Sequence, residues 1–280
     1  MVWCSQKMTS GQTAMLTGKS TILGIIPVRM ASTRFPGKPL ASILGIPMLA
    51  HVWARARMSG LLTDLIVATC DEEIRAYGSR VGMQVIMTSL AHERASDRCA
   101  EALKTWEQEQ GRRADIVVMV QGDEPMATPA MIDMAVKPLL DDPRVLVTNL
   151  MAPLKEAEEL EDPNEIKVVV DNENNALYFS REPIPSCAKW NGELRGWKQV
   201  CIIPFRRDYL LEYLALPATP LEQVESIDML RILEHSGQVK MVPENVLTYS
   251  VDTPEDLKLV EEAMRHDPLV DHYRAQFGAT

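Results

Sequence analysis

The chain has 280 residues, of which 46% are apolar, and a formal net charge of -10. This negative charge argues against extended nucleic-acid contact, which relies on Lys and Arg to neutralise phosphates. No stretch approaches the roughly 20 consecutive apolar residues that span a bilayer, and the five cysteines are scattered, as expected of reduced thiols. We therefore expect a cytoplasmic protein with neither a nucleic-acid nor a membrane partner, in which any anion-binding site is local.

The first half of the chain predicts an α/β fold. Residues 1–20 form a polar, flexible leader in this interpretation, and residues 21–280 form one domain. Strand-like and helix-like segments then alternate, which is typical of a sheet with helices on both faces. The predicted strands cover residues 22–28, 64–69, 83–87 and 115–120. The predicted helices cover residues 47–60, 71–81, 96–110 and 128–140.

The second half is less regular and predicts a mixed extension of the same sheet. Its short β segments cover residues 145–151, 166–170, 176–180 and 198–204. Helices at 206–215 and 221–235 and a strand at 247–251 follow, and Asp252 precedes a helix over 254–265. No linker-like run and no internal repeat interrupts this pattern, so we expect one continuous domain.

The clearest functional signal is the segment IIPVRMASTRFPGKPL at residues 25–40. An apolar strand ends there in a loop that carries Arg29, Arg34 and Lys38, and cations at the carboxyl end of a parallel strand suit phosphates. Backbone N–H groups of Ala31 and Ser32 can approach phosphate oxygens in such a loop. No G-x-G-x-x-G follows a predicted strand, and the GKS at 18–20 precedes its strand, so neither familiar phosphate motif explains the site.

Two aspartates follow other apolar strands. Asp123 lies in VQGDEP, directly after a predicted buried strand, and Asp252 follows the segment at 247–251. Carboxylates in this position can hold a hard divalent cation beside phosphates. The alternative is structural, with Asp123 as a loop residue and Asp252 as the N-cap of the following helix.

Six segments of the chain, in order, closely resemble the 3-deoxy-manno-octulosonate cytidylyltransferases (CMP-KDO synthetases). They are IIPVRMASTRFPGKPL, VQGDEP, NEIKVVVD, ALYFSR, PLEQVE and VDTPEDL, and the resemblance extends over residues 22–264. It implies a nucleotide-sugar-transferase-like, Rossmann-like α/β fold, a homodimer, and the use of CTP and Mg²⁺.

The resemblance also implies roles for individual residues. The nucleotide-binding residues would be Arg29, Ala31, Ser32, Arg34, Lys38 and Gln121. Asp123 and Asp252 would hold Mg²⁺, and Arg29, Lys38 and Asp123 would be the catalytic residues. An acceptor oxygen would attack the α-phosphorus of CTP in line as pyrophosphate leaves, a step in which cations stabilise the developing charge and no nucleophilic side chain is required.

The acceptor side departs from the family pattern. The acceptor-binding residues implied are Arg98, Gln121, Gln199, Ile203, Arg206, Glu222 and Asp228. Where the family reads S-G-T-E/D-R, H-x-G-I-Y-x-Y-R and L-E-Q-L-R, this chain reads RASDR at 94–98, QVCIIPFR at 199–206 and IDMLR at 227–231. If Gln199, Ile203 and Met229 face the acceptor, lost polar partners predict weak binding of KDO. Arg206, Arg231 and Lys167 would still attract an anion.

Three functions follow from these observations. The first is CTP-dependent transfer of CMP to KDO or a related 3-deoxy-ulosonic acid, with a smaller acid such as a phosphonate as the alternative acceptor. The second is a non-catalytic nucleotide binder, against which the presence of Lys38, Asp123 and Asp252 argues. The third, a nucleotidyltransferase for neutral sugar phosphates, lacks support from the downstream motifs.

Overall fold

The computed structural model describes residues 20–277 except positions 33, 156, 191, 193–195 and 246–247. The predicted leader therefore lies, up to residue 19, outside the described residues. Among the helices within the described ranges, none is both long enough and apolar enough to cross a membrane.

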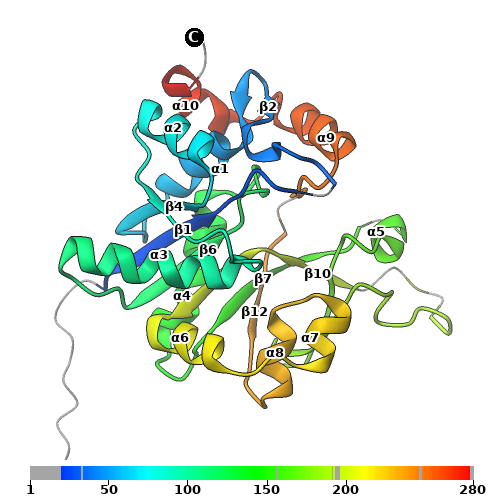
Figure 1. Cartoon of the computed structure of the whole chain (residues 1–280). Helices are drawn as coiled ribbons and strands as arrows, with labels where there is room; N and C mark the ends of the chain where they lie inside the picture. The colour runs from blue at the N-terminus through cyan, green and yellow to red at the C-terminus, as the bar shows by residue number, and fades with distance from the viewer. Residues whose placement is uncertain are drawn as a thin grey trace, which may run out of the picture.

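The first of two five-stranded sheets is built around β1 (Figure 1). Its order is β11-β6-β1-β4-β5, and every neighbouring pair is parallel except β11 with β6. The strands are β1 (Ile22–Pro27), β4 (Asp64–Thr69), β5 (Val85–Met87), β6 (Ile116–Val120) and β11 (Ile202–Arg206). All residues of β1 and β6 are buried, as continuous apolar runs in a parallel sheet predict.

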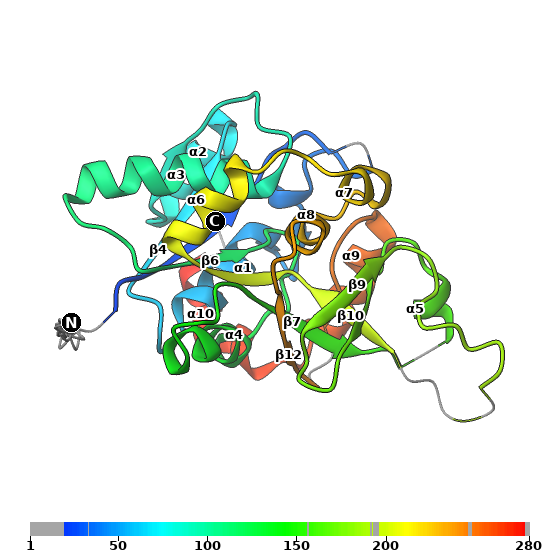
Figure 2. The same cartoon turned by 90° about the horizontal axis from the view of Figure 1, so that it is seen from below.

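Helices cover both faces of this sheet, as predicted. Ile22 and Ile26 pack with the helices of one face, and Leu23 and Ile25 pack with those of the other, because side chains alternate along a strand. Figure 2 shows α3 and α6 on one side of β4 and β6, and α4 and α10 on the other. The helices around this sheet are α1 (Met48–Arg57), α2 (Glu72–Val81), α3 (Ala95–Gln110), α4 (Pro129–Asp141), α6 (Arg207–Ala215) and α10 (Pro268–Phe277).

The prediction that the second half extends the first sheet is wrong for most of its strands, which form a second five-stranded sheet. Its order is β12-β7-β10-β8-β9, parallel between β12 and β7 and antiparallel elsewhere. The strands are β7 (Thr148–Pro153), β8 (Lys167–Val170), β9 (Ala176–Ser180), β10 (Trp197–Val200) and β12 (Lys240–Pro243). The predicted strand at 198–204 is in fact two strands, because the chain leaves the second sheet at Cys201 and enters the first as β11.

Several shorter elements also differ from the sequence-based expectation. The predicted helix at 221–235 is two helices, interrupted at Ser226, which has a left-handed φ of 55°. Of the predicted strand at 247–251, residues 248–251 are described and form no strand. The remaining elements are η1 (Lys38–Leu40), β2 (Ser42–Ile43), β3 (Ile46–Pro47), α5 (Ala157–Glu161), α7 (Pro220–Glu225), α8 (Met229–Glu234) and α9 (Pro254–Met264).

One hydrophobic cluster joins the two sheets. It contains Leu23 and Ile25 of β1 together with Met151, Val168 and Met241 of the second sheet. A second link lies at the carboxyl end of β6, where Gln121 N donates at 3.1 Å to the backbone oxygen of Cys201, the residue between β10 and β11.

Candidate active site

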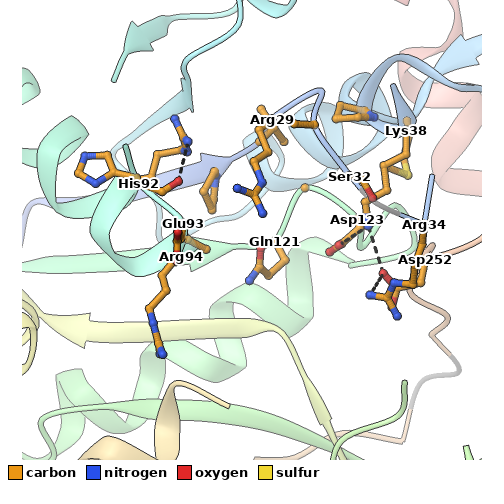
Figure 3. A pocket seen from close by; sticks show the side chains of 18 of the residues that line it. Arg29, Ser32, Arg34, Lys38, His92, Glu93, Arg94, Gln121, Asp123 and Asp252 are labelled. Carbon is orange, nitrogen blue, oxygen red and sulfur yellow. Dashed lines mark hydrogen bonds and ion pairs between the residues drawn. The ribbon is translucent and has the colours of Figure 1, made fainter. Parts of the chain in front are cut away.

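A pocket of about 700 Å³ opens where β1 and β6 end (Figure 3). Its walls are the loop after β1, the segment that enters α3, the turn after β6, and Asp252 just before α9. The predicted residues that line it are Arg29, Ala31, Ser32, Arg34, Lys38, Arg98, Gln121, Asp123 and Asp252. The structure therefore brings together the whole predicted nucleotide and metal set.

The loop after β1 is shaped by its own backbone contacts. Gly37 adopts a left-handed φ of 76°, and its N–H donates to Met30 O at 3.0 Å. The N–H of Met30 in turn donates to Asp71 Oδ2 at 2.8 Å. These contacts close the loop and leave Arg29 exposed at the pocket wall, without a hydrogen-bond partner among the described residues.

Lys38 is the centre of the charged part of the pocket. Its ammonium donates to Asp123 Oδ2 at 2.7 Å, to Val251 O at 2.8 Å and to Asp252 Oδ1 at 3.3 Å. Burial opposes the charged form of Lys38, but the two carboxylates outweigh it, so the pKa of Lys38 is raised. Arg34 reaches the same cluster, with its NH2 atom 2.9 Å from Asp252 Oδ1, and also donates to Asn164.

The position of Asp123 depends on a close backbone approach at Gly122. A Cβ atom at residue 122 would lie 2.1 Å from Val28 Cγ1 and 3.2 Å from Pro27 O. Only glycine fits against β1 at this point without displacing it. The N–H of Val251 donates to Asp123 O at 2.9 Å, which fixes the turn after β6 against the segment that carries Asp252.

Asp252 is not the N-cap of α9. Thr253 occupies that position, where its side chain accepts from Asp256 N at 3.2 Å and Asp256 Oδ2 accepts from Thr253 N at 2.8 Å. The carboxylate of Asp252 is therefore free of the capping role and faces Lys38. The structure therefore removes the N-cap alternative for this residue.

The two carboxylates suit a magnesium ion by their chemistry. Asp123 and Asp252 present hard oxygen ligands that converge on a single cationic group, the ammonium of Lys38. Mg²⁺ is usually held by one or two carboxylates together with substrate phosphates and water. No group of three or more His, Cys, Asp or Glu side chains that could hold a metal ion occurs in the described ranges.

Glu124, beside Asp123, is a buried carboxyl that the sequence did not single out. Its oxygens accept from Thr248 Oγ1 at 3.2 Å and from Cys201 N at 3.5 Å. Burial and the negative charges of Asp123 and Glu165 raise the pKa of Glu124 to about 8. Burial therefore favours the neutral form of Glu124 more than that of an exposed glutamate.

On the acceptor side, two of the predicted residues form a buried charged cluster rather than a direct lining. Glu222, fully buried, accepts two hydrogen bonds from Arg231, both at 2.7 Å, and Asp228 accepts from Ser96 Oγ at 2.8 Å. Arg94 lines the pocket and donates to both acids. Glu222 and Asp228 thus do not line the pocket themselves, but both contact Arg94, which does.

Arg98 and Gln199 have structural partners as well. Arg98 lines the pocket, but its NH1 atom donates to Thr88 Oγ1 at 2.5 Å and only 3% of the residue is exposed. Gln199, in β10, does not line the pocket, and its Nε2 atom donates to Asn149 Oδ1 at 2.5 Å.

The direction of β11 shows that the predicted acceptor roles of Ile203 and Arg206 are wrong. Because β11 runs antiparallel to β6, Ile202 pairs with Val120 near the pocket and Arg206 pairs with Ile116 at the opposite end. Arg206 donates there to backbone oxygens, among them Leu139 O at 2.7 Å, so the structure does not bring it to the acceptor. Ile203 is 3% exposed and packs in the core.

Met229 and Lys167 are likewise removed from the pocket. Met229 is fully buried in the same core cluster as Ile203. The ammonium of Lys167 donates to Asp162 O at 2.8 Å and Arg181 O at 2.5 Å. The apolar side chains at 203 and 229 therefore fill the core, and they do not form an acceptor wall.

Comparison with known proteins identifies the chemistry. Residues 23–265 match the family model described as "Cytidylyltransferase". The chain belongs to the cytidylyltransferase family. Its relatives include the 3-deoxy-manno-octulosonate cytidylyltransferase of Geobacter metallireducens, 43% identical over 87% of this chain and 98% of the relative. That of Geotalea uraniireducens is 42% identical over 87% of this chain and 99% of the relative.

Solved structures agree with the family and the fold. A structure of CMP:2-keto-3-deoxy-manno-octonic acid synthetase complexed with CTP matches with a TM-score of 0.80 and 35% identity, over 89% of this chain and 100% of that one. The 4-diphosphocytidyl-2C-methyl-D-erythritol synthase of Anaerococcus prevotii, at 13% identity and a TM-score of 0.59, shows a similar fold over 89% of this chain and 97% of that one. The fold and family that the six motifs predicted are confirmed.

Sequence reasoning missed three side chains that shape this cytidylyltransferase pocket. Asp71 holds the loop after β1, Glu124 lies beneath the aspartate pair, and Arg94 connects the pocket to Glu222. The motif RASDR drew attention to position 94, but only the structure shows where its side chain points.

Proposed function

We propose that this cytidylyltransferase transfers CMP from CTP to 3-deoxy-manno-octulosonate, with release of pyrophosphate. The observation that carries the proposal is the pocket in which the cationic loop after β1 and two aspartates converge. The names of the relatives support the acceptor, and the CTP in the related solved structure supports the nucleotide.

Different residues of the pocket would bind the nucleotide and orient the acceptor. Arg29, Arg34 and Lys38 would bind the triphosphate, and the N–H groups near Ala31 and Ser32 would bind its oxygens. Gln121, at the centre of the pocket in Figure 3, would orient the acceptor toward the α-phosphorus. Preorganised charge of this kind lowers the barrier without a covalent intermediate on the protein.

Asp123 and Asp252 would hold Mg²⁺ in the proposed enzyme. When bound, the ion would neutralise phosphate oxygens during displacement. The same two aspartates share the ammonium of Lys38 and hold it beside the loop after β1 that would bind the phosphates.

We further propose that residues 21–280 form one domain and that the enzyme works in the cytoplasm as a homodimer. The family match over 23–265 and the core shared by the two sheets support one domain. Family resemblance supports the dimer, and the scattered cysteines support the compartment. Sedimentation equilibrium of the purified protein tests the dimer, and a single cooperative unfolding transition tests the domain.

A pyrophosphate-release assay tests the proposed function. CTP with Mg²⁺ and KDO should release pyrophosphate, and CTP should raise the melting temperature more than ATP, GTP or UTP because a ligand that binds the native state stabilises it. A panel of smaller carboxylic and phosphonic acids covers the alternative acceptor. Equal stabilisation by all four nucleotides would contradict the assignment of CTP.

A further inference from the structure

Arg94 connects the nucleotide pocket to charged groups in the second half of the chain. Its side chain is 28% exposed and lines the pocket, and its NH1 atom donates to Glu222 and, at 2.6 Å, to Asp228 Oδ1. Figure 3 shows Arg94 and Lys38 on opposite sides of Gln121. Arg94 therefore belongs to the wall of the pocket opposite the loop after β1, on the side where we expect the acceptor to bind.

The charge of Arg94 balances its surroundings. Glu222 accepts two hydrogen bonds from Arg231, and Arg94 donates to both Glu222 and Asp228. Without Arg94, the negative charge of these acids would be compensated less well at the pocket wall and would repel an anionic acceptor more strongly.

The contacts of Arg94 leave one edge of its guanidinium available. Both acids are bound by NH1, and neither Nε nor NH2 has a hydrogen-bond partner among the residues that the structure describes. Nε and NH2 form the planar, two-donor edge that matches a carboxylate. Because NH1 is held in place, this edge is fixed in direction before a ligand arrives.

We propose that Arg94 is an acceptor-specificity residue whose Nε and NH2 atoms bind the carboxylate of the acceptor. The inference rests on the proposed function and adds a contact that the family pattern S-G-T-E/D-R does not contain, because serine stands where this chain has Arg94. An arginine at this position adds a planar pair of donors to the pocket wall.

The test is steady-state kinetics on Arg94→Ser and Arg94→Lys with KDO and with its carboxamide. In the unmodified enzyme, the carboxamide should be about 10- to 100-fold poorer than KDO in kcat/KM. Arg94→Ser should lose a similar factor with KDO and little more with the carboxamide. Arg94→Lys keeps the charge without the planar edge, so it should recover only part of the loss.

Two controls separate this contact from general damage. Arg207→Ser breaks a comparable half-buried ion pair, with Glu107, outside the pocket and should leave both kcat/KM values unchanged. The KM for CTP should stay within about twofold in all variants, since the proposed contact is to the acceptor alone. A parallel rise in the KM for CTP, or full activity of Arg94→Lys, would overturn the inference.

A failure of the proposed function itself is distinguishable. If the unmodified protein releases no pyrophosphate with CTP and any acid, that function fails, and calorimetric titration with KDO decides the inference without turnover. Weaker binding of KDO to Arg94→Ser than to the unmodified protein would support the contact. Equal binding would overturn it.

Discussion

Lys38 and Asp123 form an ion pair of 2.7 Å that links the loop after β1 to the turn after β6. The two residues are 85 positions apart in sequence, and the parallel pairing of β1 with β6 brings them to the same edge of the sheet. The carboxylate that we propose as a Mg²⁺ ligand and the ammonium that we propose as a phosphate-binding group are thereby in direct contact.

The first prediction concerns Asp123. Asp123→Asn keeps the shape of the side chain but weakens both the hard-cation site and the pair with Lys38, so kcat should fall by about 100-fold or more. Asp252→Asn should behave similarly. The measurement is pyrophosphate release at saturating CTP, with circular dichroism to verify the fold.

Asp142→Asn is the matched control for this prediction. Asp142 pairs with Arg144 at the surface, outside the pocket, and its loss should leave kcat unchanged. Near-normal activity of Asp123→Asn would show that Asp123 has only a structural role.

The second prediction concerns the close approach at Gly122. Gly122→Ala would place Cβ 2.1 Å from Val28 Cγ1, so the turn that carries Asp123 must move and kcat should fall at least about tenfold. Val28→Ala removes the clashing atom, so the double variant should recover part of the activity. No recovery in the double variant would point to Pro27 O, 3.2 Å from the added Cβ, as the decisive contact.

The third prediction is a pH dependence that comes from His51. This fully buried residue lies between Tyr273 OH, at 2.8 Å, and Ile43 O, at 2.9 Å. Burial, with a smaller contribution from the charge of Arg55, lowers the pKa of His51 to about 4. The unfolded chain, with a His pKa near 6.5, binds the proton more readily, so stability is fully present above about pH 6.5 and is lost as pH falls toward 4.

The size of this effect is measurable by urea unfolding. The free energy of unfolding should fall by about 1 kcal/mol for each pH unit between 6.5 and 4, before other groups are added. His51→Gln should remove that part of the slope, although its stability at pH 8 should be lower. His266→Gln, at an exposed position, should retain the slope. Identical slopes in both variants would contradict the role of His51.

The sequence predicted the nucleotide half of the site better than the acceptor half for a physical reason. The cationic loop and Asp123 follow buried strands whose apolar runs define both the strand and its carboxyl end. A parallel sheet then requires these loops to meet. Asp252 belongs with them, but its approach depends on residues 248–251, which form no strand and leave no periodic signal.

The acceptor half depends on pairings that local pattern does not encode. Residues 198–204 have the pattern of one strand, yet Cys201 divides them between two sheets, and the antiparallel direction of β11 carries Arg206 away from the pocket. Ser226 interrupts a helical pattern by adopting a left-handed conformation that serine rarely favours. The contacts of Arg94 join the start of α3 to Glu222 and Asp228, which are 128 and 134 positions away in sequence.

The last prediction concerns the buried pair of Glu222 and Arg231. Glu222 has no exposed surface, and Arg231 donates to both of its oxygens at 2.7 Å. Glu222→Gln leaves Arg231 without its counter-charge in a position where water cannot replace it, so the free energy of unfolding should fall by about 3 to 5 kcal/mol. Urea unfolding at pH 7.5 measures the change.

The control for Glu222 is an exposed pair. Glu262→Gln removes the carboxylate that pairs with Arg265 at 3.0 Å on the surface of α9, and it should cost no more than about 0.5 kcal/mol because solvent screens the pair. A large loss of stability in Glu222→Gln beside a small loss in Glu262→Gln would show that burial of the pair, and not charge pairing alone, causes the effect. Similar small losses in both variants would mean that Asp228 or water compensates Arg231, and that the cluster does not depend on the charge of Glu222.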